Sequence, residues 1–298
     1  MSEQVAEPNE SVVVMLRDEL LSIGIPPRPA VLANIEAEMR SKAPNYVALE
    51  KIIRLDVGVS ASLLKIANSA FFGFSGRIRS VQEALQILGL NTVASAIAAL
   101  SLRKAFDHVP NMERFWDSSA CIAQISGWLA TQLKHPDRRV KPEEAYTFGL
   151  FRDCGIPVLM ANFSDYIDVL RLANAEEVRP FTAIEDDEMG VNHAMIGAKL
   201  AKEWRLPIEY GAAIDFHHDR EALLGLSPHV TPDIARYFIA LAQLAEFLYQ
   251  RQTGLNQTLE WGKLGDACLT VLHLDMEQVE ALQQALAANQ VHVEHITG

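Results

Sequence analysis

The chain has 298 residues, of which 49% are hydrophobic, and its 38 acidic and 26 basic side chains give a formal net charge of −12. A chain of this length and composition can bury one large core or two smaller ones, which indicates a globular protein. The acidic balance disfavours nucleic acid as a general partner, because nonspecific binding to phosphate backbones needs a basic surface.

No segment predicts a membrane span or an export signal. The apolar run 93–102 is short and contains serines, and the N-terminus has no basic region followed by an apolar block. We therefore expect a cytoplasmic protein with no membrane partner. Cys121, Cys154 and Cys268 are odd in number and form no CxxC pair, which indicates reduced thiols and argues against a cysteine-based zinc site.

Helical spacing of apolar residues recurs along the chain, and no convincing alternating strand pattern interrupts it. Asn45 is a predicted N-cap, and Ser80 with Glu83 has the spacing of a capping box. The ranges that predict helices are 11–23, 30–39, 46–55, 60–69, 80–88, 91–106, 112–133, a helix beginning at Pro142, 158–173, 193–204, 208–218, 232–249 and 276–288. The sequence therefore predicts an all-α fold, with a boundary between two helical halves at residues 108–111.

A carboxylate in an apolar segment marks the candidate site. Asp153 follows Arg152 within the otherwise apolar stretch 147–159, where a charge is costly without a charged partner, a metal or several donors. His193 and the pair His217–His218 are the imidazole groups downstream. These residues are the candidates for a common site centred on Asp153.

Structural interpretations compete with this one. The acidic run 185–188 could supply metal ligands, but it is interpreted as the carboxylate-rich first turn of the helix that carries His193, where it would face the helix dipole. His193 alone is interpreted as a packed histidine with one satisfied nitrogen. His217 and His218 are expected at a helix C-terminus, which favours the imidazolium form.

Several segments resemble the HDOD family, the HD-related output domain of bacterial signalling proteins. They are Ile25–Pro29, Leu63–Gly73 with its leucine-alanine-asparagine-serine block, Ile78–Leu90, Asn192–Gly197 and Phe216–Asp219. The resemblance implies an all-helical domain over 21–219, with an N-terminal half at 21–110 and a half at 111–219 that is related to HD phosphohydrolases. Residues 1–20 are then a lead-in helix, and 220–298 a C-terminal helical extension.

The resemblance also implies which metal ligands are replaced. HD hydrolases hold one or two metals with histidines and aspartates, and the metal activates a bound water. Arg152–Asp153 stands where such an enzyme has its histidine–aspartate pair, and Gln243 stands at the closing aspartate. Ser118 stands at the histidine position of the first helix, with Asp117 as a neighbouring candidate. Arginine has no lone pair for a metal. Asp153, His193 and His217 or His218 remain as ligands for one Zn, Mn, Fe or Ni ion, although no cofactor is expected.

Three functions follow from the resemblance. We expect a noncatalytic bacterial signalling module that contacts signalling proteins on separate chains, with a degenerate metal site. The alternatives are a divergent metal-dependent phosphohydrolase acting on a nucleotide or phosphoester, and a sensor of a nucleotide second messenger with Arg152 on the phosphate. Candidate contact surfaces are Phe71–Phe74 and the helices after Thr231, whereas Arg77 and Arg79 are interpreted as solvated loop charges.

Overall fold

The computed structural model describes residues 24–68, 77–133, 140–229, 231–255 and 257–288. Within these ranges every regular element is a helix and none is a strand, which confirms the all-α prediction. The predicted helix at 11–23, the lead-in at 1–20 and the Phe71–Phe74 surface lie outside the described residues.

The helices follow one another with short connections. They are α2 (Ala30–Met39), α3 (Tyr46–Ile53), α4 (Val57–Ala67), α5 (Val81–Ala105), α6 (Glu113–Gln132), α7 (Pro142–Phe151), α8 (Gly155–Asn162), α9 (Tyr166–Ala175), α10 (Phe181–Met189), α11 (His193–Glu203), α12 (Ile208–Asp215), α13 (Arg220–Leu224), α14 (Asp233–Thr253), α15 (Glu260–Leu272) and α16 (Met276–Ala288).

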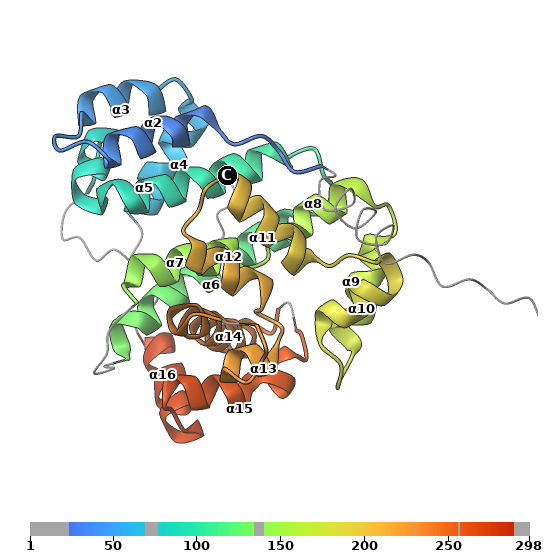
Figure 1. Ribbon diagram of the computed structural model, residues 1–298. Coiled ribbons are helices and arrows are strands. Elements are labelled where there is room, and N and C mark those ends of the chain that lie inside the picture. The colour runs from blue at the N-terminus through green and yellow to red at the C-terminus, as the bar shows by residue number, and fades with distance from the viewer. Residues whose placement is uncertain (1–23, 69–76, 134–139, 230, 256, 289–298) are drawn as a thin grey trace, which may run out of the picture.

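Helices α2, α3 and α4 pack against α5 and form one end of the molecule, at the upper left in Figure 1. Gly89 interrupts α5 with a φ of 77°, a conformation that glycine adopts without a Cβ clash. By length and apolar composition alone, α5 passes the test for a membrane span, as a core helix of a soluble protein also can. The break at Gly89 and the packing against three neighbouring helices favour the second interpretation.

The other half is organised around α14, which packs against α6, α7 and α12. Phe148 on α7 and Phe238 on α14 stack with ring centroids 5.7 Å apart, and both rings are buried. Helix α11 packs against α8 and α12. Helix α12 packs against both α11 and α14, and thereby connects these two helices in this half of the molecule (Figure 1).

Local capping explains the accurate helix starts. The Asn45 side chain accepts a hydrogen bond from the Ala48 amide at 3.0 Å, which confirms the predicted N-cap. Ser80 accepts a hydrogen bond from the Glu83 amide at 3.1 Å, as predicted. The Glu83 carboxylate, however, accepts from the Arg79 amide at 2.6 Å, so the reciprocal half of the capping box lies one residue earlier than expected.

Several helix predictions were wrong or incomplete. The range 158–173 is not one helix, because α8 ends at Asn162 and α9 begins at Tyr166. The helix predicted to start at residue 60 begins at Val57, and the predictions omit α10, α13 and α15. The early start of α4 has a local cause, since Asp56 caps this helix by accepting from the Val59 amide at 3.1 Å.

Replacing Asp56 with alanine is expected to lower the free energy of unfolding at pH 7 by about 1 kcal/mol, chiefly through the lost cap. The Lys104 hydrogen bond at 2.6 Å and the Val59 amide lower the pKa of Asp56. Its stabilising effect is therefore complete above the ordinary carboxyl pKa and is lost as pH falls through the lowered folded-state pKa. Urea unfolding at pH 7 and near pH 3 checks this. The difference in unfolding free energy between Asp56→Ala and wild type should be smaller near pH 3 than at pH 7. An unchanged difference would contradict this prediction. The exposed Asp187→Ala variant is the control.

Candidate functional site

Asp153 lies in the tight turn between α7 and α8. The amide of Arg152 continues the helical bonding to Phe148 at 2.8 Å, and the Ile156 amide donates to the Asp153 carbonyl at 2.9 Å. Helices on both sides therefore fix the backbone of this turn. The Asp153 side chain is 18% exposed, whereas the histidines that it faces are buried.

His193 is the first residue of α11, whose N-cap is Asn192. Its Nδ1 atom lies 2.7 Å from a carboxylate oxygen of Glu185, which is fully buried, and its backbone amide donates to the same oxygen at 3.2 Å. The other Glu185 oxygen accepts a hydrogen bond from the Tyr166 hydroxyl. Burial alone would lower the pKa of His193, but Glu185 raises it above its ordinary value. Glu185 thus fixes the imidazole ring and supports positive charge on it.

His217 follows the end of α12, and its Nδ1 atom lies 2.6 Å from the Ile214 carbonyl oxygen. A carbonyl only accepts hydrogen bonds, so Nδ1 carries the proton. Burial, together with the neighbouring His218, lowers the pKa of His217 to about 3. The ring is therefore neutral at pH 7, and its Nε2 atom presents a lone pair.

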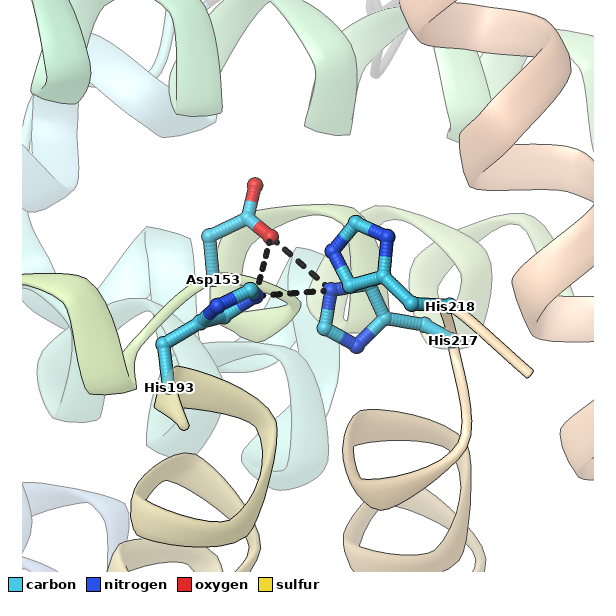
Figure 2. Close-up of side chains that lie close together, drawn as sticks. All are labelled: Asp153, His193, His217 and His218. Atoms are coloured by element: carbon cyan, nitrogen blue, oxygen red, sulfur yellow. Dashed lines mark hydrogen bonds and ion pairs between the residues drawn. The ribbon is translucent and has the colours of Figure 1, made fainter. Parts of the chain in front are cut away.

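Three potential ligand atoms converge between these residues (Figure 2). The distance from Asp153 Oδ1 to His217 Nε2 is 3.1 Å, that from Asp153 Oδ1 to His193 Nε2 is 3.7 Å, and the two Nε2 atoms are 3.2 Å apart. A proton on His193 Nε2 satisfies only one of the His217 and Asp153 acceptors at a time. A cation at the centre would contact all three atoms, Asp153 Oδ1 and the two Nε2 atoms. The arrangement therefore favours a bound cation.

The same distances agree with a metal centre. Ligand atoms bound to one tetrahedral zinc at about 2.0–2.1 Å lie about 3.3 Å apart. Histidine ligands in metal sites ordinarily donate the other ring N–H group to a carboxylate or a carbonyl, as His193 and His217 do here. Imidazole and carboxylate together suit Zn, Fe, Ni and Mn. The residues present therefore fit one divalent ion.

His218 is the fourth member of this group, whose potential ligand atoms all lie within 4.8 Å of one another. Its ring packs at 4.1 Å from the ring of His217, and its Nδ1 atom lies 2.5 Å from Glu260. Lys263 also bonds to Glu260, at 2.6 Å. Although burial alone would raise the pKa of Glu260, His218 and Lys263 lower it to about 2, so this carboxylate stays ionised beside His218.

Arg152 occupies the other side of Asp153. Its Nη2 atom lies 2.7 Å from Asp153 Oδ2, and its Nη1 atom donates to both Gln243 and Glu246 on α14, each at 3.1 Å. The side chain is only 5% exposed. Burial alone would lower the pKa of Arg152, but the Asp153 and Glu246 carboxylates raise it. Burial likewise would raise the pKa of Asp153, but Arg152 holds it well below its usual range.

The sequence profile of the HDOD domain matches residues 25–220, about two thirds of the chain. The chain belongs to the HDOD family. A protein of Treponema pallidum (strain Nichols) with no characterised function is 26% identical over 197 residues, which make up 65% of this HDOD chain and 38% of that relative. The chain thus spans well under half the length of the curated relative that it matches.

Solved structures share the fold of this HDOD chain. An HDOD domain protein of unknown function from Geobacter sulfurreducens has a TM-score of 0.68 at 22% identity, over 97% of this chain and all of that one. A candidate signal transduction protein from Marinobacter aquaeolei VT8 has a TM-score of 0.66 at 22% identity, over 93% and 59% of the two chains. A candidate phosphohydrolase from Shewanella amazonensis SB2B has a TM-score of 0.65 at 18% identity, over 95% and 97%.

The HDOD fold brings most of the sequence-predicted residues together. Asp153, His193, His217 and His218 form one group, and Gln243 reaches it through Arg152. Ser118 lies on α6, where its hydroxyl donates to the Phe115 carbonyl of the same helix at 3.0 Å. Ser118 is therefore engaged within its own helix.

Three local interpretations were wrong. Residues 185–188 are not the first turn of the helix that carries His193; they lie in the second half of α10, and Glu185 points into the core. His193 has a partner at each ring nitrogen rather than one. His217 does lie at the C-terminal end of α12, where its Nδ1 atom bonds to the Ile214 carbonyl, but burial keeps the ring neutral and it is not an imidazolium.

Glu185, Glu246 and Glu260 are site residues that the sequence analysis did not single out. Glu246 alone had a readable signal, because it follows Gln243 by three residues and shares its face of α14. Glu260 lies on α15, which was not predicted. Glu185 was noticed only as one member of an acidic run.

Proposed function

We propose that this HDOD chain is a regulatory module that acts through protein contacts and does not hydrolyse phosphoesters. The observation that carries the proposal is the buried Arg152 guanidinium, which bonds to Asp153, Gln243 and Glu246. Signalling proteins on separate chains are its proposed partners, and the cytoplasm its proposed location. A pull-down from the native host with wild-type chain identifies the partners.

The chemistry of Arg152 opposes two-metal hydrolysis. A metal binds lone pairs, and a guanidinium has none and stays protonated. Arg152 also bonds to Asp153 Oδ2 at 2.7 Å, so this carboxylate has only Oδ1 directed at the histidines. The fixed positive charge beside Asp153 lowers the affinity of any second cation there.

Arg152 is also poorly placed to bind a phosphate. Its Nε atom and both of its amino groups already bond to protein side chains, and the guanidinium is buried. A phosphate would have to replace these bonds. The geometry therefore favours a structural role for Arg152 over the role of a nucleotide sensor at this centre.

A single divalent ion fits on the other face of Asp153. Asp153, His193 and His217 would hold it, with His218 nearby, and such an ion lowers the pKa of a bound water. The convergence of these three residues supports the second candidate function, a metal-dependent phosphohydrolase with one ion. Glu185 and the Ile214 carbonyl orient the two imidazoles for either function.

Metal content and turnover distinguish the two candidates. We expect protein purified without chelator to hold at most one Zn, Mn, Fe or Ni ion per chain and to hydrolyse no member of a panel of phosphodiesters and nucleotides. The matched control is Asp153→Asn, which keeps the shape of the side chain and removes its charge. Stoichiometric metal together with turnover that disappears in Asp153→Asn would contradict the regulatory proposal and establish the hydrolase.

Replacing Glu185 with glutamine is expected to weaken metal affinity by roughly 10–100-fold, because the amide supports the His193 ring less well than the carboxylate. Competition titration with a chromophoric zinc chelator measures the change. Glu188→Gln, on the same helix but exposed, is the control and should bind as wild type. Equal affinity for Glu185→Gln and wild type would show that the metal does not bind through His193.

A further inference from the structure

A second candidate site lies between the two halves of the molecule, away from the Asp153 centre. A cavity of about 990 Å³, open to solvent on one side, is lined by α4, the C-terminal part of α5, α6, α7 and the segment 77–79. None of the four grouped metal-ligand candidates lines it. Its volume is at the upper end of the range for small-molecule sites, about 300–1,000 Å³.

The charged side chains that line this cavity are all basic. They are Lys65 on α4, Arg77 and Arg79 in the connecting segment, and Arg103 on α5. Among the described residues no acidic side chain lines the cavity, although acidic side chains outnumber basic ones by 38 to 26 in the whole chain. Four cations at one opening of an acidic protein give a local positive potential, which attracts a ligand with several negative charges.

Two of these cations, Arg77 and Arg79, belong to a segment whose backbone is fixed. The Asn68 side-chain amide donates a hydrogen bond to the Ile78 carbonyl and accepts one from the Ile78 amide, each at 2.8 Å. These bonds fix the segment between Arg77 and Arg79 at the end of α4. Among the described residues, no ion pair is recorded for any of the four cations. Lys104, the neighbour of Arg103, is by contrast paired with Asp56 at 2.6 Å.

The rest of the wall is mainly apolar and includes two aromatic side chains. Trp116 on α6 is half-buried and Tyr146 on α7 is buried, and both line the cavity. A ligand with a single carboxylate would need one of the four cations. Several arginines around an apolar space with aromatic walls are instead suited to a planar ring that carries phosphate groups, since guanidinium binds phosphate in a bidentate manner.

We propose that this cavity binds a nucleotide with two or more phosphate charges. The base lies in the apolar part beside Trp116 and Tyr146, and Lys65, Arg77, Arg79 and Arg103 bind the phosphates. Arg77 and Arg79 are exposed, as the sequence analysis expects, and bind the phosphates from the opening of the cavity. This inference is independent of the regulatory proposal, because it uses no residue of the Asp153 centre.

The test is calorimetric titration of the full chain with ATP, GTP, a cyclic dinucleotide, pyrophosphate and dodecanoate. We expect at least one nucleotide to bind well below millimolar concentration and to quench the fluorescence of Trp116. The Arg77→Gln/Arg79→Gln variant should weaken binding roughly tenfold or more, since hydrogen bonds to charged groups are the strong ones. Ala61→Trp, which fills the exposed edge of the cavity, should abolish it. The exposed Arg171→Gln variant on α9 is the matched control.

The location is tested separately from the affinity. In the Trp116→Phe variant the quenching should disappear while calorimetric binding persists, because the other tryptophans lie elsewhere in the fold. Absence of nucleotide binding up to millimolar concentration would overturn the proposal. Binding of pyrophosphate as tightly as ATP, binding of dodecanoate alone, or nucleotide binding unaffected by both Ala61→Trp and Arg77→Gln/Arg79→Gln would also overturn it.

Discussion

Replacing Arg152 with methionine is expected to lower the free energy of unfolding by about 3–5 kcal/mol, the cost of removing one partner from a buried ion pair. The substitution keeps an unbranched side chain of similar length but leaves Asp153 and Glu246 without their cation. Burial already raises the pKa of Glu246 against the opposing effect of Arg152, so this carboxyl is expected to take up a proton in the variant. Urea unfolding at pH 7 measures the loss.

A control variant distinguishes the loss of this buried ion pair from the effect of removing an exposed arginine. Arg171 forms an exposed pair with Asp168 on α9, and Arg171→Met should cost less than about 1 kcal/mol because exposed ion pairs contribute little. Adding Asp153→Asn and Glu246→Gln to Arg152→Met should recover much of the stability, since both uncompensated charges are removed. A loss below about 1 kcal/mol for Arg152→Met alone would show that Arg152 does not neutralise the centre.

Arg152 also connects stability with function. Its removal frees Asp153 Oδ2, which in the wild type bonds to the guanidinium at 2.7 Å. Zinc or manganese should therefore restore part of the stability of Arg152→Met, because an ion that binds only the folded state stabilises it by mass action. Such a restoration would show that the positive charge of Arg152 stabilises the fold where a metal ion otherwise could.

Local signals in the sequence were sufficient for most helix boundaries. Asn45 and Ser80 cap the helices that they were predicted to cap, because an N-cap bond joins residues only three apart. The split between α8 and α9 was missed because the apolar spacing of 158–173 continues across Phe163 and Asp165. Short-range sequence patterns do not predict helix breaks that are set by packing against other helices.

The site depended on contacts that no local pattern contains. The sequence analysis grouped Asp153 with His193 and the pair His217–His218 because a carboxylate in an apolar segment needs partners, and the resemblance directed attention to Gln243. Glu185 and Glu246 were missed because their roles arise from partners 8 and 94 residues away in the chain. The proton positions on His217 likewise follow from a carbonyl that only the folded chain places at its Nδ1 atom.

Gly155→Ala is the variant that tests how the backbone positions His193. A Cβ atom on Gly155 would lie 2.0 Å from the His193 carbonyl oxygen and 2.9 Å from the Gly197 amide nitrogen, so α8 and α11 would have to separate. Because backbone cannot give way as a flexible side chain can, we expect a loss of about 3 kcal/mol, the upper part of the usual range for overpacking. Urea unfolding measures it.

The same substitution should also change the metal centre. Moving the start of α11 takes His193 Nε2 away from the positions 3.2 Å from His217 Nε2 and 3.7 Å from Asp153 Oδ1, so any metal affinity should fall together with stability. Gly262→Ala on α15 is the control, since nothing lies within 4 Å of its Cβ position, and helix propensity predicts equal or slightly higher stability. If Gly155→Ala unfolds as wild type, the close contact of α8 and α11 does not hold His193. Loss of stability with unchanged metal affinity would show that the ion binds through Asp153 and His217 without His193.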